Sequence, residues 1–110
     1  MKKLLVTRLQ YDEFLYPIVA AAPSENTKEA FLTDKVLVVL EAVGIAPKMK
    51  DDGTPVGHPW FRLKNDEVEF ELEDAHADLI LKKMEAAIPT LQTWRVRQML
   101  PLITQLKKES

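Results

Sequence analysis

The side chains best suited to chemistry lie near residue 75, where Glu73, Asp74, His76 and Asp78 occur within six residues. Their carboxylate oxygens and imidazole nitrogen are ligands that divalent metal ions use. On a helix, however, His76 and Asp78 would point in different directions, because residues two apart do not share a face. No HExxH or EF-hand motif accompanies the group. We therefore predict no metal site and no cofactor, and we expect Asp74 to cap a helix that begins here.

A second candidate for chemistry is His58, which precedes Pro59 and Trp60. A catalytic base needs a nucleophile, and the sequence contains no cysteine and no GxSxG motif. Its three glycines form no phosphate-binding loop. Pro59 and Trp60 are explained by a loop that leads into a strand and by an aromatic anchor at that strand. We predict no catalytic residue, and we retain His58 and Trp60 as candidates for contact with a partner.

The third candidate is the mixture of aromatic and basic residues at Trp94, Arg95 and Arg97, a combination that is typical of single-strand binders. On a helix the two arginines lie on different faces, and we expect Trp94 to pack against the core. A nucleic-acid site would need Arg62, Lys82, Arg95 and Arg97 to converge on one face. The net charge of -2, from 17 acids and 15 bases, does not favour phosphate binding.

The elements that position these residues follow from a change in apolar period. Val68, Phe70 and Leu72 alternate with Glu67, Glu69, Glu71 and Glu73, which predicts a strand with an acidic outer face. Such a face discourages chance pairing at a strand edge, and it could also meet a basic partner. We expect residues 60–63 to form a hairpin with this strand across 64–67. A helix from about 75 to 87 should follow, burying Ala77, Ile80, Leu81, Met84 and Ile88.

The other elements are predicted in the same way. Residues 3–9 are either a strand or the first turns of a helix. The stripe Tyr11, Phe14, Leu15, Ile18, Val19 and Ala22 predicts a helix that kinks or restarts at Pro17. A helix from about 27 to 43 buries Phe31 or Leu32, with Val36, Val39, Leu40 and Val43, and Gly44 is the expected left-handed terminator. A last helix from about 93 to 107 aligns Val96, Met99, Leu100, Ile103 and Leu106, and Pro101 should kink it.

Residues 45–59 are predicted to be a flexible loop. Three prolines, Gly53, Gly57 and the Asp51-Asp52-Gly53 turn signal leave little room for regular structure. The stretch is longer than an ordinary connection, so it is either mobile or functional.

Composition limits the number of domains, the fold class and the cellular location. A chain of 110 residues that is 46% hydrophobic predicts one domain, residues 1–110. We predict an α+β fold in which three to four helices pack against a small antiparallel hairpin or three-stranded sheet. The absence of cysteine suits a reducing compartment. No apolar stretch approaches the length of a membrane span, and the first residues lack a signal-peptide cleavage site, so we predict a cytoplasmic protein without membrane contact.

The segment "VEFELEDAHADLILKKMEAAIP", followed by "TWRVRQMLPLITQLKK", resembles the small acidic proteins encoded in bacteriophage and prophage gene clusters. The likeness is one of pattern and covers about residues 32–107. It implies a binding or assembly role and transfers no functional residue.

The sequence therefore favours a non-catalytic protein-interaction module. Its candidate contact residues are His58, Trp60, Trp94, Arg95 and Arg97, together with the 45–59 loop. The partner is another protein or a second copy, because free strand edges and surplus apolar surface allow a homodimer. A nucleic-acid-binding regulator is one alternative. A small metal-dependent hydrolase, which would need His58 beside His76, is the other.

Overall fold

The chain begins with a strand, β1 (Lys2–Thr7), in which Leu4 and Val6 are fully buried while Lys3 and Leu5 face solvent. The computed structural model describes residues 1–57 and 59–108. Thr7 ends the strand and caps the next turn, because its hydroxyl accepts from the Gln10 N–H and its own N–H donates to the Gln10 side chain. Of the two alternatives for residues 3–9, the strand is therefore correct for residues 3–7, whereas residues 8 and 9 belong to the helix that follows.

The helical segment after β1 is interrupted by one wide turn. It comprises α1 (Arg8–Gln10), the π-helical turn η1 (Tyr11–Leu15) and α2 (Tyr16–Ala21). In the wide turn the Tyr16 N–H donates to the Tyr11 carbonyl, five residues back. Pro17 then stands in the first turn of α2, where its missing N–H costs nothing. The irregularity predicted at Pro17 is thus the π-helical turn just before it, because the backbone is helical without a break from Arg8 to Ala21 and α2 begins at Tyr16.

The helix α3 (Thr27–Glu41) starts where the sequence predicted, with Asn26 accepting from the Glu29 N–H at 2.8 Å. Its buried positions include Val36 and Leu40, whereas Phe31 is 68% exposed and Leu32 packs partly against the core. Leu32, not Phe31, is thus the inward residue of that pair.

The role predicted for Gly44 is wrong. Positive φ angles occur at Gly53 and Gly57, and Gly44 lies instead in the short strand β2 (Gly44–Ile45). A Cβ at position 44 would stand 2.7 Å from the hydroxyl oxygen of Tyr11 and 3.2 Å from the Phe61 ring. Close packing, not a left-handed turn, therefore requires glycine here.

The described strands form two antiparallel two-stranded sheets, so the predicted hairpin is wrong. β4 (Glu67–Leu72) pairs with β1, with Leu4 opposite Phe70, while β3 (Arg62–Leu63) pairs with β2. The turn between β3 and β4 is held by Arg8, whose backbone N–H donates to the Asp66 carbonyl at 2.8 Å. That contact continues the β1–β4 ladder by one pair beyond Thr7 and Glu67.

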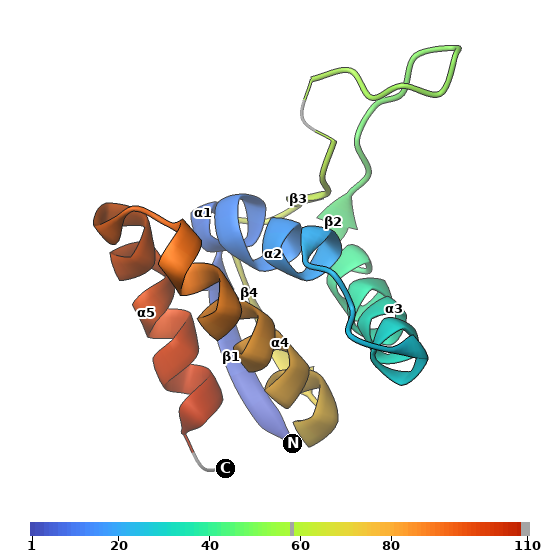
Figure 1. Ribbon diagram of the computed structural model, residues 1–110. Helices are drawn as coiled ribbons and strands as arrows, with labels where there is room; N and C mark the ends of the chain where they lie inside the picture. Colours follow the sequence, from blue (N-terminus) through green and yellow to red (C-terminus); the bar gives the residue numbers. More distant parts are fainter. Residues whose placement is uncertain (58, 109–110) are drawn as a thin grey trace.

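Two helices cover the apolar face of the larger sheet. α4 (Asp74–Ala87), the 3₁₀ turn η2 (Ile88–Thr90) and α5 (Thr93–Lys107) follow β4 directly. In Figure 1, α4 and α5 lie side by side across β1 and β4, with α2 and α3 beyond α4. The core includes Phe70, Leu72, Ile80, Met84 and Met99. The fold is α+β, as predicted.

The buried face of α5 differs from the predicted stripe at Leu100, and Val96 is only partly buried. Met99, Ile103 and Leu106 are buried as expected, but Leu100 is 46% exposed and Leu102 is fully buried instead.

Candidate interaction surface

Trp94 lies in the first turn of α5 and projects outward. Its side chain is 59% exposed, so the prediction that it packs against the core is wrong. The indole Nε1–H donates to the Gln92 side-chain oxygen at 2.7 Å, which satisfies the polar atom and fixes the ring near the start of the helix. The apolar face of the ring is therefore presented to solvent in a defined orientation.

Arg95 lies next to Trp94 and stacks on aromatic rings. Its guanidinium carbon is 5.4 Å from the centre of the Phe14 ring and 5.5 Å from that of Trp94. Its Nη2 is 3.8 Å from a Glu13 carboxylate oxygen. Its Nε is buried and has no hydrogen-bond partner within the described part of the chain. Burial of this unpaired N–H lowers the stability of the free protein's arrangement at Arg95.

These residues line a cleft of about 310 Å³ between α5 and the helical segment after β1. We call it the Trp94 surface, and its residues are Leu9, Glu13, Phe14, Trp94, Arg95 and Gln98. Leu9 is 53% exposed and extends the apolar area. Tryptophan and arginine are enriched among the residues that dominate binding energy at interfaces, and both line this cleft.

The predicted loop forms an arm that extends away from the helices, and Figure 1 shows it beyond the paired strands β2 and β3. The arm comprises residues 46–61, of which the structure describes all but 58. Its tip is a tight turn in which the Lys50 N–H donates to the Thr54 carbonyl at 2.7 Å and the Gly53 N–H donates to the Lys50 carbonyl at 2.9 Å. Gly53 has a φ of 86°, the left-handed value that this turn requires.

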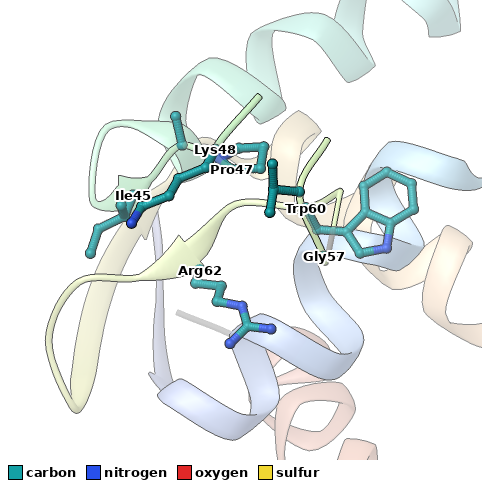
Figure 2. A pocket seen from close by; sticks show the side chains of 8 residues that line it. Ile45, Pro47, Lys48, Gly57, Trp60 and Arg62 are labelled. Carbon is teal, nitrogen blue, oxygen red and sulfur yellow. The ribbon is translucent and has the colours of Figure 1, made fainter. Parts of the chain in front are cut away.

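A second cleft, of about 400 Å³, lies at the base of the arm. Figure 2 shows Pro47 and Lys48 on the outgoing side and Trp60 on the returning side, with Arg62 below it. The Trp60 ring is anchored against Tyr16, with 6.3 Å between ring centres. Among the described residues that line it, the cleft carries the two cations Lys48 and Arg62 and no acid.

The structure thus separates the candidate contact residues. Trp94 and Arg95 share the Trp94 surface, whereas Trp60 belongs to the arm cleft. Arg97 is exposed on another side of α5 and does not line the Trp94 surface. His58 lies outside the described residues. Leu9, Glu13 and Gln98 could not be recognised as contact residues from the sequence, because no sequence pattern shows that the helical segment after β1 lies beside α5.

The acidic group near residue 75 lies at the start of α4. Glu73, not Asp74, is the N-cap, and its side chain makes no capping hydrogen bond, so the predicted capping role of Asp74 is wrong. Asp74 lies in the first turn, 3.9 Å from the Met1 ammonium group. His76 Nε2 is 3.7 Å from a Glu73 oxygen. Within residues 1–57 and 59–108 no three such side chains are grouped as metal ligands.

The basic residues of the nucleic-acid alternative are distributed over several elements. Lys82 on α4 lies 2.9 Å from Glu25 and 2.8 Å from Glu29, and the hydrogen bond to Glu29 raises the pKa of Lys82. Arg95 faces Glu13, and Arg62 lines the arm cleft. Two of the four cations therefore already lie against carboxylates, which weakens their use as phosphate contacts.

Comparisons with protein-family models, with curated proteins and with solved structures found no match to this chain. Among the described residues, no helix has the length and apolar character needed to span a bilayer.

Proposed function

We propose that this protein is a non-catalytic, cytoplasmic protein-interaction module whose partner binds the Trp94 surface. The observation that carries the proposal is the exposure of Trp94, at 59%, beside Leu9, at 53%. Burying the exposed indole against a partner would stabilise the complex by about 25 cal/mol for each Å² of apolar surface removed from water. Tryptophan and arginine are also the residues that most often dominate binding energy at interfaces.

The chemistry of this surface suggests what the partner presents. An apolar side chain would fill the cleft between Leu9 and Trp94. A carboxylate of the partner could pair with the part of the Arg95 side chain that stays accessible, since this side chain is 34% exposed. A partner segment that carries an apolar residue next to an acidic one fits both requirements.

The arm offers the same partner a second contact. Its cleft joins the Trp60 ring to the cations Lys48 and Arg62. The pattern-level resemblance to small acidic phage and prophage proteins supports an assembly role, in which two separate contact surfaces would hold neighbouring subunits.

Site-specific photocrosslinking tests the proposal. A photoreactive benzophenone amino acid replaces Gln98, an exposed residue of the Trp94 surface, so that Trp94 itself is kept. The protein is expressed in its own cells, and the adducts are identified by mass spectrometry. Val38 on α3 provides the matched control position, because it is 60% exposed and lies outside the Trp94 surface.

The expected result is one protein adduct of defined mass from position 98 and none from position 38. An adduct at twice the mass of the chain would identify the partner as a second copy. An adduct that nuclease removes would support the nucleic-acid alternative, and equal labelling at both positions would overturn the proposal.

A further inference from the structure

The larger sheet has two strands and therefore two outer edges, and one of them is closed by a side chain. The Leu5 N–H on β1 donates to the Gln105 Oε1 at 2.7 Å, and the Leu5 carbonyl accepts from the Gln105 Nε2 at 3.0 Å. The amide of Gln105 on α5 thus replaces a neighbouring strand at this point. The backbone groups of Leu5 consequently point away from β4.

The other edge, on β4, presents its backbone groups outward. The register places Leu5 opposite Glu69. In an antiparallel pair, two opposed residues either both point their N–H and C=O groups at each other or both point them away. Glu69 therefore directs its groups away from β1, and so do Glu67 and Glu71 by the two-residue period. Among the described residues β4 pairs with β1 alone, so no strand accepts these groups.

We propose that the outer edge of β4 accepts an extended segment of another protein as a third strand. We further propose that this segment carries lysine or arginine at every second position. Main-chain hydrogen bonds to Glu67, Glu69 and Glu71 would provide the pairing, as in other cases of strand addition. This surface is distinct from the Trp94 surface, and the inference does not depend on the function proposed above.

Charge selects a basic segment over a second copy. The side chains of Glu67, Glu69 and Glu71 are all exposed on the outer face of the sheet. If β4 paired with β4 of another copy, glutamates would lie opposite glutamates, and directly opposed like charges are destabilising. A strand with cations at those positions would place each of them beside a carboxylate.

Fluorescence anisotropy with a labelled peptide that alternates lysine and valine tests this inference. In the proposed register the backbone N–H of each lysine donates to a backbone carbonyl of β4, because Glu67, Glu69 and Glu71 direct their backbone groups outward. A second peptide carries a methyl group on the backbone nitrogen of each lysine. This removes the main-chain donors and keeps the side-chain charges. A third replaces lysine with glutamate. We expect binding of the first peptide and loss of binding by the other two.

Variants of the protein provide the reciprocal test. Glu69→Pro removes a backbone N–H that points outward and leaves the hydrogen bonds between β4 and β1 in place. Proline is tolerated at such positions of edge strands. It should weaken binding of the lysine peptide by about tenfold or more. Glu73→Gln, which removes an acid beyond the strand end, is the matched control and should change binding little. If Glu69→Pro loses its native circular dichroism, the methylated peptide on the wild-type protein decides alone.

Three results would overturn the inference. The first is that the lysine peptide does not bind. The second is that the methylated peptide binds as tightly as the lysine peptide, which would mean that charge attraction acts without strand pairing. Alternatively, the wild-type protein sediments as a dimer that Glu69→Pro dissociates, which would make a second copy the occupant.

Discussion

The ammonium group of Lys83 donates a hydrogen bond to the backbone carbonyl of Ala22, 3.2 Å away, although Lys83 is only 4% exposed. Ala22 is the residue at the carboxyl end of α2, where a cation is favoured by the unpaired carbonyl groups. The same ammonium lies 3.9 Å from a Glu29 oxygen on α3. One buried side chain of α4 thus links the end of α2 to the beginning of α3.

Replacing this ammonium should destabilise the fold. Lys83→Met keeps the apolar stem and removes the donor, so we expect the free energy of unfolding to fall by about 1–3 kcal/mol in urea titrations. Lys82→Met is the control, since Lys82 is half exposed and its ion pairs are screened by water. Equal losses in the two variants would contradict a special role for Lys83.

Gly44 and Tyr11 should be energetically coupled. The buried Tyr11 hydroxyl donates to the Leu40 carbonyl at 2.7 Å, so it cannot move away from a Cβ placed 2.7 Å from it without losing that bond. We expect Gly44→Ala to cost less in a Tyr11→Phe background than in the wild type, with a coupling of at least about 0.5 kcal/mol. Urea unfolding of the four proteins measures it, and strictly additive losses would refute it.

Glu29 should make stability depend on acid pH. The hydrogen bond from Lys82 is the main cause that lowers the pKa of Glu29 below its ordinary value. A lowered pKa stabilises the folded state above the ordinary pKa of about 4.3, and this contribution is lost as the pH falls through the folded-state value. The difference in unfolding free energy between the wild type and Glu29→Gln should therefore be constant near neutrality and shrink in acid.

Asp34→Asn, on the exposed side of the same helix, serves as the control for that pH series. A Glu29→Gln difference that persists undiminished in acid would show that the carboxylate charge contributes nothing.

The contact between Gln105 and Leu5 can be tested at a single amide. Gln105→Met removes the acceptor of the Leu5 N–H, so hydrogen exchange at Leu5 should accelerate. The Leu4 amide, which faces β4 by strand alternation, should keep its protection. The loss of two hydrogen bonds should also lower stability by about 1–2 kcal/mol. Unchanged exchange at Leu5 would contradict the contact.

The local features of this fold could be read from the sequence. The change of period near residue 73 correctly located the end of β4 and the start of α4, because alternation and helical spacing are properties of neighbouring residues. The pairing of β4 could not be read in this way. Its partner β1 lies about sixty residues earlier, and no pattern of neighbouring residues relates two strands so far apart in the chain.

The exposure of Trp94 could have been predicted from the spacing of residues along α5. At 3.6 residues per turn, a position five residues before the buried Met99 points about 140° away from it. Arg95, four residues before Met99, is directed towards the core side, where it meets Phe14. Hydrophobicity alone suggested burial of the indole, and the helical geometry decided otherwise.

We have proposed that Trp94 anchors a protein partner. Once the partner is identified by crosslinking at position 98, its dissociation constant should be measured with the wild type, Trp94→Ala and Val38→Ala. We predict that Trp94→Ala weakens binding by about thirtyfold or more, the effect of losing a dominant interface residue, and that Val38→Ala leaves it unchanged. Equal affinity of the wild type and Trp94→Ala would contradict the account.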